Sequence, residues 1–219
     1  MRDITAALDV NGFIERPTVL ARCFGKLAVA ILAFSAWHAA HAERMGWALA
    51  YEGKDYPIFL YDPKAVDLIA SDLNIAADGN AMAAFRGVPN PVNVLEGRYV
   101  SSSSCQPHQC PFNRGFFWLD TATGETLAAR NTISYPNKLE YREHGVPMLR
   151  EYSELIIGGS ARSVQMISPE AMRALRSWIV ANDLRFDKVQ FRSHVMNRNA
   201  HITLDPSEYS VPGSHPATR

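Results

Sequence analysis

The chain has 219 residues, of which 47% are hydrophobic and 20% charged, and its 22 Lys and Arg residues balance 22 Asp and Glu residues. This composition is typical of a globular protein, and it excludes a disordered chain, a collagen-like fibre and a small scaffold held mainly by disulfides. Because the net charge is zero and no block of like charges occurs, the sequence offers no field that would gather nucleic acid or anionic lipid.

The first recognisable element is a leader. Arg22 and Lys26 precede an apolar run over residues 27–37, and the small-residue step Ala-His-Ala follows at 40–42. A basic flank, a short apolar core and a small-x-small step are typical of a secretory signal peptide, and so short an apolar run does not span a bilayer. We therefore expect residues 1–42 to be a signal peptide with an N-terminal extension, and the mature protein to be periplasmic without a membrane span. An uncleaved anchor or a buried core helix is the alternative for this segment.

Residues 43–206 are expected to form one globular domain, because a segment of this length can bury a core of its own. Residues 207–219 show no hydrophobic periodicity, and we expect them to form a flexible tail. The sequence leaves the oligomeric state open, a homodimer included.

Two helices are predicted from their start signals. Asp62 followed by Pro63 is an N-cap with proline at the first helical position, and apolar residues then recur on one face. Ser168 and Pro169 repeat the same start before a second apolar stripe. Both patterns indicate amphipathic helices that cover a sheet, and the stripe of the second helix indicates core packing rather than a ligand site.

Strand patterns outnumber these helices. Residues 116–119 and 126–129 flank a turn that contains Gly124, which predicts a β-hairpin. Short connections between strands favour antiparallel pairing, so we predict an α+β fold in which helices pack on one side of an antiparallel sheet. The other strand candidates are residues 56–61, 97–102, 151–157, 163–167, 187–192 and 200–204.

The most informative stretch lies between a strand candidate and the hairpin, where Cys105 and Cys110 enclose Pro107 and His108. Loss of Cys23 with the leader leaves these two cysteines as a pair, and an even pair in an exported protein should be oxidised. Closing so small a ring contributes only about 2 kcal/mol of entropic stabilisation, so its main effect is to fix local shape. Proline adds a further restriction on the backbone. The sequence therefore predicts a stiff, protruding, disulfide-closed loop that holds the histidine away from the fold.

The pattern Cys105-x-Pro107-His108-x-Cys110 resembles the protruding loop of the inhibitor-of-vertebrate-lysozyme (Ivy) family of bacterial periplasmic proteins. In that family the loop reads Cys-Lys-Pro-His-Asp-Cys and also lies between a strand and a hairpin. The resemblance covers at most residues 95–130. It implies that the loop enters the active-site cleft of a C-type lysozyme, that the histidine engages the catalytic carboxylates, and that the two cysteines form a disulfide. The residues that it assigns to partner binding are Gln106, Pro107, His108 and Gln109.

Two of these residues depart from the family pattern, because Gln106 and Gln109 stand where the family has Lys and Asp. The loop thus lacks two charges that would assist its shape and its contacts. The histidine retains a physical role: a retaining glycosidase keeps two carboxyl groups about 5 Å apart, and a protonated imidazole donates from both ring nitrogens. An exposed histidine with no partner is the alternative interpretation.

Two other classes of function stay open. A periplasmic enzyme, such as a hydrolase, would assemble its site from residues distant in sequence, whereas a structural envelope protein would use the loop only as a stable turn. We expect an inhibitor rather than an enzyme, with no cofactor and no metal site. A metal site at the loop is not expected, because cysteines joined in a disulfide offer no thiolate ligands. A nucleophilic serine at Ser160 is not expected either, because Arg162 stands where the nucleophile-elbow motif needs glycine.

Overall fold

The computed structural model describes residues 45–54, 59–76, 79–134, 139–141, 147–149, 152–193 and 201–211. The predicted leader lies outside the described residues. Within the described part of the chain, no helix has both the length and the apolar character needed to cross a membrane.

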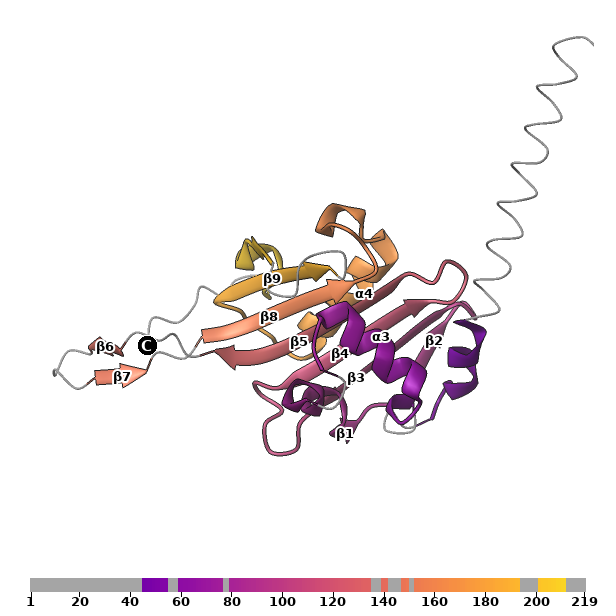
Figure 1. Cartoon of the computed structure of the whole chain (residues 1–219), viewed down its shortest axis with the longest axis horizontal. Helices are drawn as coiled ribbons and strands as arrows, with labels where there is room; N and C mark the ends of the chain where they lie inside the picture. Colours follow the sequence, from indigo (N-terminus) through magenta and orange to yellow (C-terminus); the bar gives the residue numbers. More distant parts are fainter. Residues whose placement is uncertain are drawn as a thin grey trace, which may run out of the picture. The chain divides into compact units, whose positions relative to one another are not determined.

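An eight-stranded sheet forms the centre of the domain (Figure 1). Its strand order is β1-β3-β4-β5-β8-β9-β10, and β2 also pairs with β3. A separate two-stranded ladder pairs β6 with β7. The strands are β1 Val88–Pro89, β2 Asn93–Leu95, β3 Tyr99–Cys105, β4 Arg114–Asp120, β5 Thr126–Ser134, β6 Leu139–Tyr141, β7 Pro147–Leu149, β8 Tyr152–Gly159, β9 Lys188–Ser193 and β10 Ile202–Leu204.

The α+β class is confirmed, since the domain combines helices with a largely antiparallel sheet. The predicted hairpin is also confirmed: β4 pairs antiparallel with β5 and, on its other side, with β3. One pair departs from the expected antiparallel sheet: β8 and β9 run parallel. Parallel neighbours need a crossover connection, and the segment between these two strands contains the second predicted helix.

Both predicted helices are present and begin as their sequences indicate. Asp62 Oδ1 accepts a hydrogen bond from the Lys64 amide at 2.9 Å, and Ser168 Oγ accepts from the Ala171 amide at 3.2 Å. These side chains satisfy backbone donors that a helix start leaves unpaired. The helices are α3, Pro63–Leu73, and α4, Pro169–Ala181.

The two helices pack on opposite faces of the sheet, which corrects the expectation that helices share one side (Figure 1). In β4, Phe117 and Leu119 join the core cluster that includes α3, whereas Phe116 and Trp118 join the cluster that includes α4. Because side chains alternate along a strand and both sets are apolar, each face of the sheet requires its own cover.

Two strand predictions are wrong. Residues 163–167 contain a 3-10 helix, in which Met166 is exposed. In the candidate 56–61, Phe59 and Leu60 are helical and both are buried, so the alternation of a strand is absent; residues 55–58 lie outside the described part. Short apolar runs do not distinguish a strand from a helical turn by periodicity alone. The 3-10 helices are η1 Gly46–Tyr51, η2 Asn80–Phe85, η3 Val164–Met166 and η4 Pro206–Glu208.

The expected tail begins later than Ser207. Tyr209 is buried, and Ser210 Oγ accepts a hydrogen bond from the Phe186 amide at 3.2 Å. Residues 209–211 therefore pack against the domain, and the residues after 211 lie outside the described part.

A buried carboxyl group connects α3 to the sheet. Asp72 Oδ1 accepts a hydrogen bond from Thr126 Oγ1 at 2.9 Å, and burial raises the pKa of Asp72 to about 7. The helix lies directly on β8 at Gly158, where a Cβ would come 2.0 Å from the Asp72 carbonyl oxygen. The glycine permits this close approach, which places the carboxyl group in the dry interface.

The raised pKa predicts a specific pH dependence of stability. An unfolded aspartate titrates near pH 4, whereas folded Asp72 titrates near pH 7. Between these two pH values the folded state binds more protons than the unfolded state. The free energy of unfolding therefore falls as pH rises through this window. The substitution Asp72→Asn keeps an acceptor for Thr126 but does not titrate. In urea unfolding at a series of pH values, the variant should gain stability relative to the wild type as pH rises, by up to about 1.4 kcal/mol per pH unit. Parallel pH profiles for the two proteins would contradict this assignment.

Candidate functional site

The predicted loop connects β3 to β4, and its disulfide is formed. Cys105 ends β3 and is bonded to Cys110, with their Cα atoms 4.9 Å apart. The base of the loop lies beside β1, because Val88 pairs with Cys105 in the sheet (Figure 1). The prediction of an oxidised pair is confirmed.

The tip of the loop is a tight turn that presents His108. The Gln109 amide donates to the Gln106 carbonyl oxygen at 3.0 Å, with Pro107 and His108 between them. His108 has a φ of 62°, in the left-handed region, and proline followed by a positive φ is typical of a type II turn. A histidine in this conformation costs energy, so the surrounding structure must hold it there. Both central side chains are exposed.

Asn113 stabilises the loop from the inside. It is buried, its amide donates to the Gln109 carbonyl oxygen at 2.8 Å, and its own carbonyl oxygen accepts from the Gln106 amide at 2.9 Å. Its Nδ2 donates to Gln106 Oε1 and, at 3.4 Å, to Gln109 Oε1. Asn113 was not among the predicted site residues. An asparagine soon after the ring and before a strand is the signal that could have identified it.

The four predicted partner-binding residues therefore divide into two pairs. Pro107 and His108 are exposed at the tip, whereas Gln106 and Gln109 are half-buried and direct their side-chain oxygens to Asn113. The glutamines thus support the shape of the loop.

The segment before β1 holds the base of the loop from outside. A Cβ on Gly87 would lie 1.7 Å from the Cys105 carbonyl oxygen and 2.8 Å from Pro107 Cδ. The Gly87 amide also donates to Ser104 Oγ at 3.1 Å. Sequence patterns gave no sign of this contact, since it joins residues 17 positions apart.

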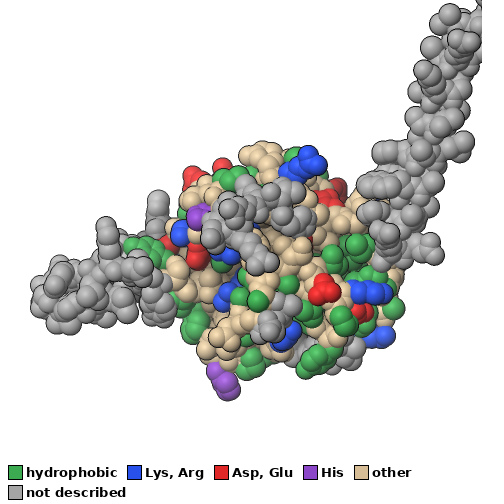
Figure 2. Space-filling view, in the orientation of Figure 1, with side chains coloured by type: hydrophobic (Ala, Val, Ile, Leu, Met, Phe, Trp, Pro, Cys, Tyr) green, Lys and Arg blue, Asp and Glu red, His purple; other side chains and the backbone are tan. Residues whose placement is uncertain are grey.

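The disulfide loop itself carries no charged side chain apart from an ionisable imidazole, and exposed apolar residues accompany it. Residues 105–113 contain no Lys, Arg, Asp or Glu. Val88 and Phe112 are 48% and 39% exposed, respectively. On the face that Figure 2 shows, cationic and anionic side chains are interspersed rather than gathered in one patch. The loop therefore offers a rigid turn with one imidazole and no Lys, Arg, Asp or Glu of its own.

In the described ranges, metal-ligating side chains do not cluster and the Ser160 hydroxyl is bonded to the backbone. No group of three or more His, Cys, Asp or Glu residues there could hold a metal ion. Ser160 Oγ accepts from the Thr126 amide at 3.0 Å and is 3.5 Å from the Thr126 carbonyl oxygen, so this hydroxyl has a role in strand packing.

The role of Asn113 can be tested by Asn113→Ala. We expect the free energy of unfolding to fall by about 1–3 kcal/mol, because the substitution removes the Nδ2 donor and leaves the side-chain oxygens of Gln106 and Gln109 without this partner. Amide hydrogen exchange within residues 106–113 should accelerate more than exchange in β5. As a control, Asn93→Ala removes an exposed asparagine whose Nδ2 contacts only the Pro91 carbonyl oxygen at 3.3 Å. Equal effects of the two substitutions on the loop amides would contradict the role assigned to Asn113.

Comparison with known proteins adds a family match for this region. The family model described as inhibitor of vertebrate lysozyme (Ivy) matches residues 74–144. The match includes the whole disulfide loop and extends beyond residues 95–130 on both sides. No curated protein and no solved structure matches the chain. Residues 74–144, about a third of the chain, thus match the Ivy family model, which confirms the resemblance predicted from the Cys105–Cys110 loop.

Proposed function

We propose that this protein inhibits a C-type lysozyme by inserting the Cys105–Cys110 loop into the active-site cleft. The observation that carries the proposal is the exposed His108, held at the tip of a closed turn within the segment that matches the Ivy family. The protein acts by binding another protein, so the loop residues are contact residues and no catalytic residue, cofactor or metal is required.

The chemistry of the imidazole suits such a cleft. A retaining glycosidase keeps its acid and its nucleophile about 5 Å apart. Protonated His108 can donate one hydrogen bond from each ring nitrogen, and nearby carboxylates favour the protonated form. The ring would therefore bind both carboxyl groups at once and exclude the substrate from them.

The rigidity of the loop favours tight binding to a partner, although the loop contains no Lys, Arg, Asp or Glu. The disulfide and the bonds to Asn113 hold the turn before any partner arrives, so docking costs little conformational entropy. Pro107, Phe112 and Val88 offer exposed apolar surface around the histidine. Because the loop is neutral apart from the imidazole, the association rate should depend only weakly on salt.

The histidine is the decisive test of the mechanism. His108→Ala should weaken inhibition of a C-type lysozyme by about 2–4 kcal/mol, roughly 30-fold to 1000-fold, because it removes a central anchor and leaves buried partner groups unpaired. His201→Ala, which removes another exposed histidine, is the matched control and should retain full potency. The measurement is the inhibition constant of each folded variant.

Two outcomes would contradict this proposal in different ways. Full potency of His108→Ala would reject the histidine as the inserted group, and inhibition would then use another surface. Failure of the wild-type protein to inhibit at micromolar concentration would reject C-type lysozyme as the target.

We also propose export to the periplasm, with cleavage after residue 42, on the basis of the leader pattern and of an oxidised cysteine pair. Protein recovered from the periplasm of an expressing bacterium should begin at Glu43 and gain two protons in mass on reduction. Intact-mass spectrometry with and without reductant measures both features. An intact Met1 on the recovered protein would overturn the proposed cleavage.

A further inference from the structure

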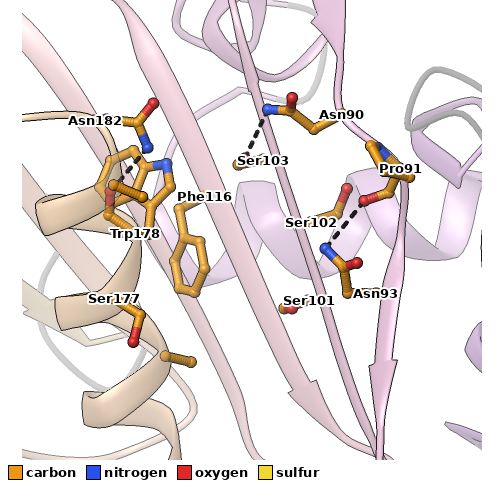
Figure 3. A pocket seen from close by; sticks show the side chains of 12 residues that line it. Asn90, Pro91, Asn93, Ser101, Ser102, Ser103, Phe116, Ser177, Trp178 and Asn182 are labelled. Atoms are coloured by element: carbon orange, nitrogen blue, oxygen red, sulfur yellow. Dashed lines mark hydrogen bonds between the residues drawn. The ribbon is translucent and has the colours of Figure 1, made fainter.

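A polar groove lies along β3 on the face of the sheet that α4 covers only in part (Figure 3). The helix packs over β4 and β5, so it leaves the neighbouring β3 open on this face. Residues 90–93, from the β1–β2 connection and β2, form the opposite wall. The cavity measures about 500 Å³, and no residue of the disulfide loop lines it.

The groove is lined by hydroxyl and carboxamide groups, and only some of them form hydrogen bonds within the protein. Asn90 Nδ2 donates to Ser103 Oγ at 3.0 Å. Within the described ranges, the hydroxyls of Ser101 and Ser177 make no hydrogen bond to another protein group. Figure 3 shows Ser177 on α4 and Ser101 on β3 on opposite sides of the space. The polar side chains are Asn90, Asn93, Ser101, Ser103, Ser177 and Asn182.

The lining of this cavity contains no Lys, Arg, Asp or Glu. A phosphate, a carboxylate or an ammonium group would therefore find no opposite charge here after losing its water. The groove favours an uncharged ligand that forms hydrogen bonds through several neutral groups.

Aromatic rings supply apolar surface beside these polar groups. Phe116 and Trp178 stack with their centroids 5.3 Å apart, and both line the cavity. A second cavity of about 220 Å³ shares Ser101 and Ser177 with the first and is lined by Tyr99, which stacks on Trp118. The second cavity also contains Glu96, Glu170 and Arg173, so the uncharged groove is the first cavity alone.

We propose that this groove binds a neutral oligosaccharide. Sugar rings carry hydroxyl groups at their edges and C–H groups on their faces, so they match a lining that combines hydroxyl, carboxamide and aromatic groups without charge. An acetamido substituent would suit the carboxamides of Asn90 and Asn93. The site is separate from the loop, so its occupation does not require a lysozyme.

Titration of the purified protein with chitotetraose, without lysozyme, tests the proposal. Nitrogen-15 NMR should show saturable shifts of the Ser101 and Ser177 amides and of the Trp178 indole. Ser177→Phe, which fills the groove, should weaken binding more than about tenfold, and Ser101→Ala should weaken it about threefold to tenfold by removing one hydrogen bond. Val180→Phe is the matched control, because this residue of the same helix is exposed and lies outside both cavities.

The outcomes separate this site from the inhibitory loop. His108→Ala should leave saccharide binding unchanged, even if it abolishes inhibition. Absence of saturable binding at millimolar chitotetraose and maltotetraose would overturn the proposal, as would binding that survives Ser177→Phe. Stronger binding of a neutral tetrapeptide than of either saccharide would overturn it in favour of a peptide site.

Discussion

Strand β4 is buried on both of its faces, and the rest of the domain is arranged around this constraint. From Gly115 to Asp120 every residue of the strand is buried. Alternation along the strand sends Phe117 and Leu119 to one core cluster and Phe116 and Trp118 to the other. Two covers are therefore needed, and α3 and α4 supply them from opposite ends of the chain. The crossover through α4 also places β9 parallel to β8.

The same constraint gives the disulfide loop a rigid base. The loop leaves the sheet from β3 and returns through β4, and the Phe85 ring lies so close to Gly115 that a Cβ there would come 2.5 Å from it. Asn113 and the disulfide then extend this rigidity to the turn that holds His108 in the left-handed conformation. A strained residue persists only where its surroundings determine it, and here the surroundings are fixed by the core.

The serine-rich strand β3 shows how one element can serve two faces. Ser102 and Ser104 are buried, and Ser104 accepts from the Gly87 amide at the base of the loop. Ser101 and Ser103 alternate with them and line the groove beside α4. Because the helix covers β4 and β5 rather than β3, these two hydroxyls border an open space. The loop and the groove thus arise from one strand while presenting different chemistry: an imidazole at a protruding tip, and neutral hydroxyls in a hollow.

Features that depend on neighbouring residues follow from the amino-acid sequence alone. Proline after Asp62 and after Ser168 marked the helix starts, and Gly124 marked the hairpin. The pattern Cys105-x-Pro107-His108-x-Cys110 indicated the closed loop and its resemblance to the Ivy family. Each of these signals acts through hydrogen bonds or backbone angles within a few residues. Other features follow from the folded arrangement: which face each helix covers, how β9 pairs, how Gln106 and Gln109 turn toward Asn113, and where a groove is left open. Those outcomes depend on contacts between segments far apart in the chain, and apolar periodicity shows that a face is buried without showing what buries it.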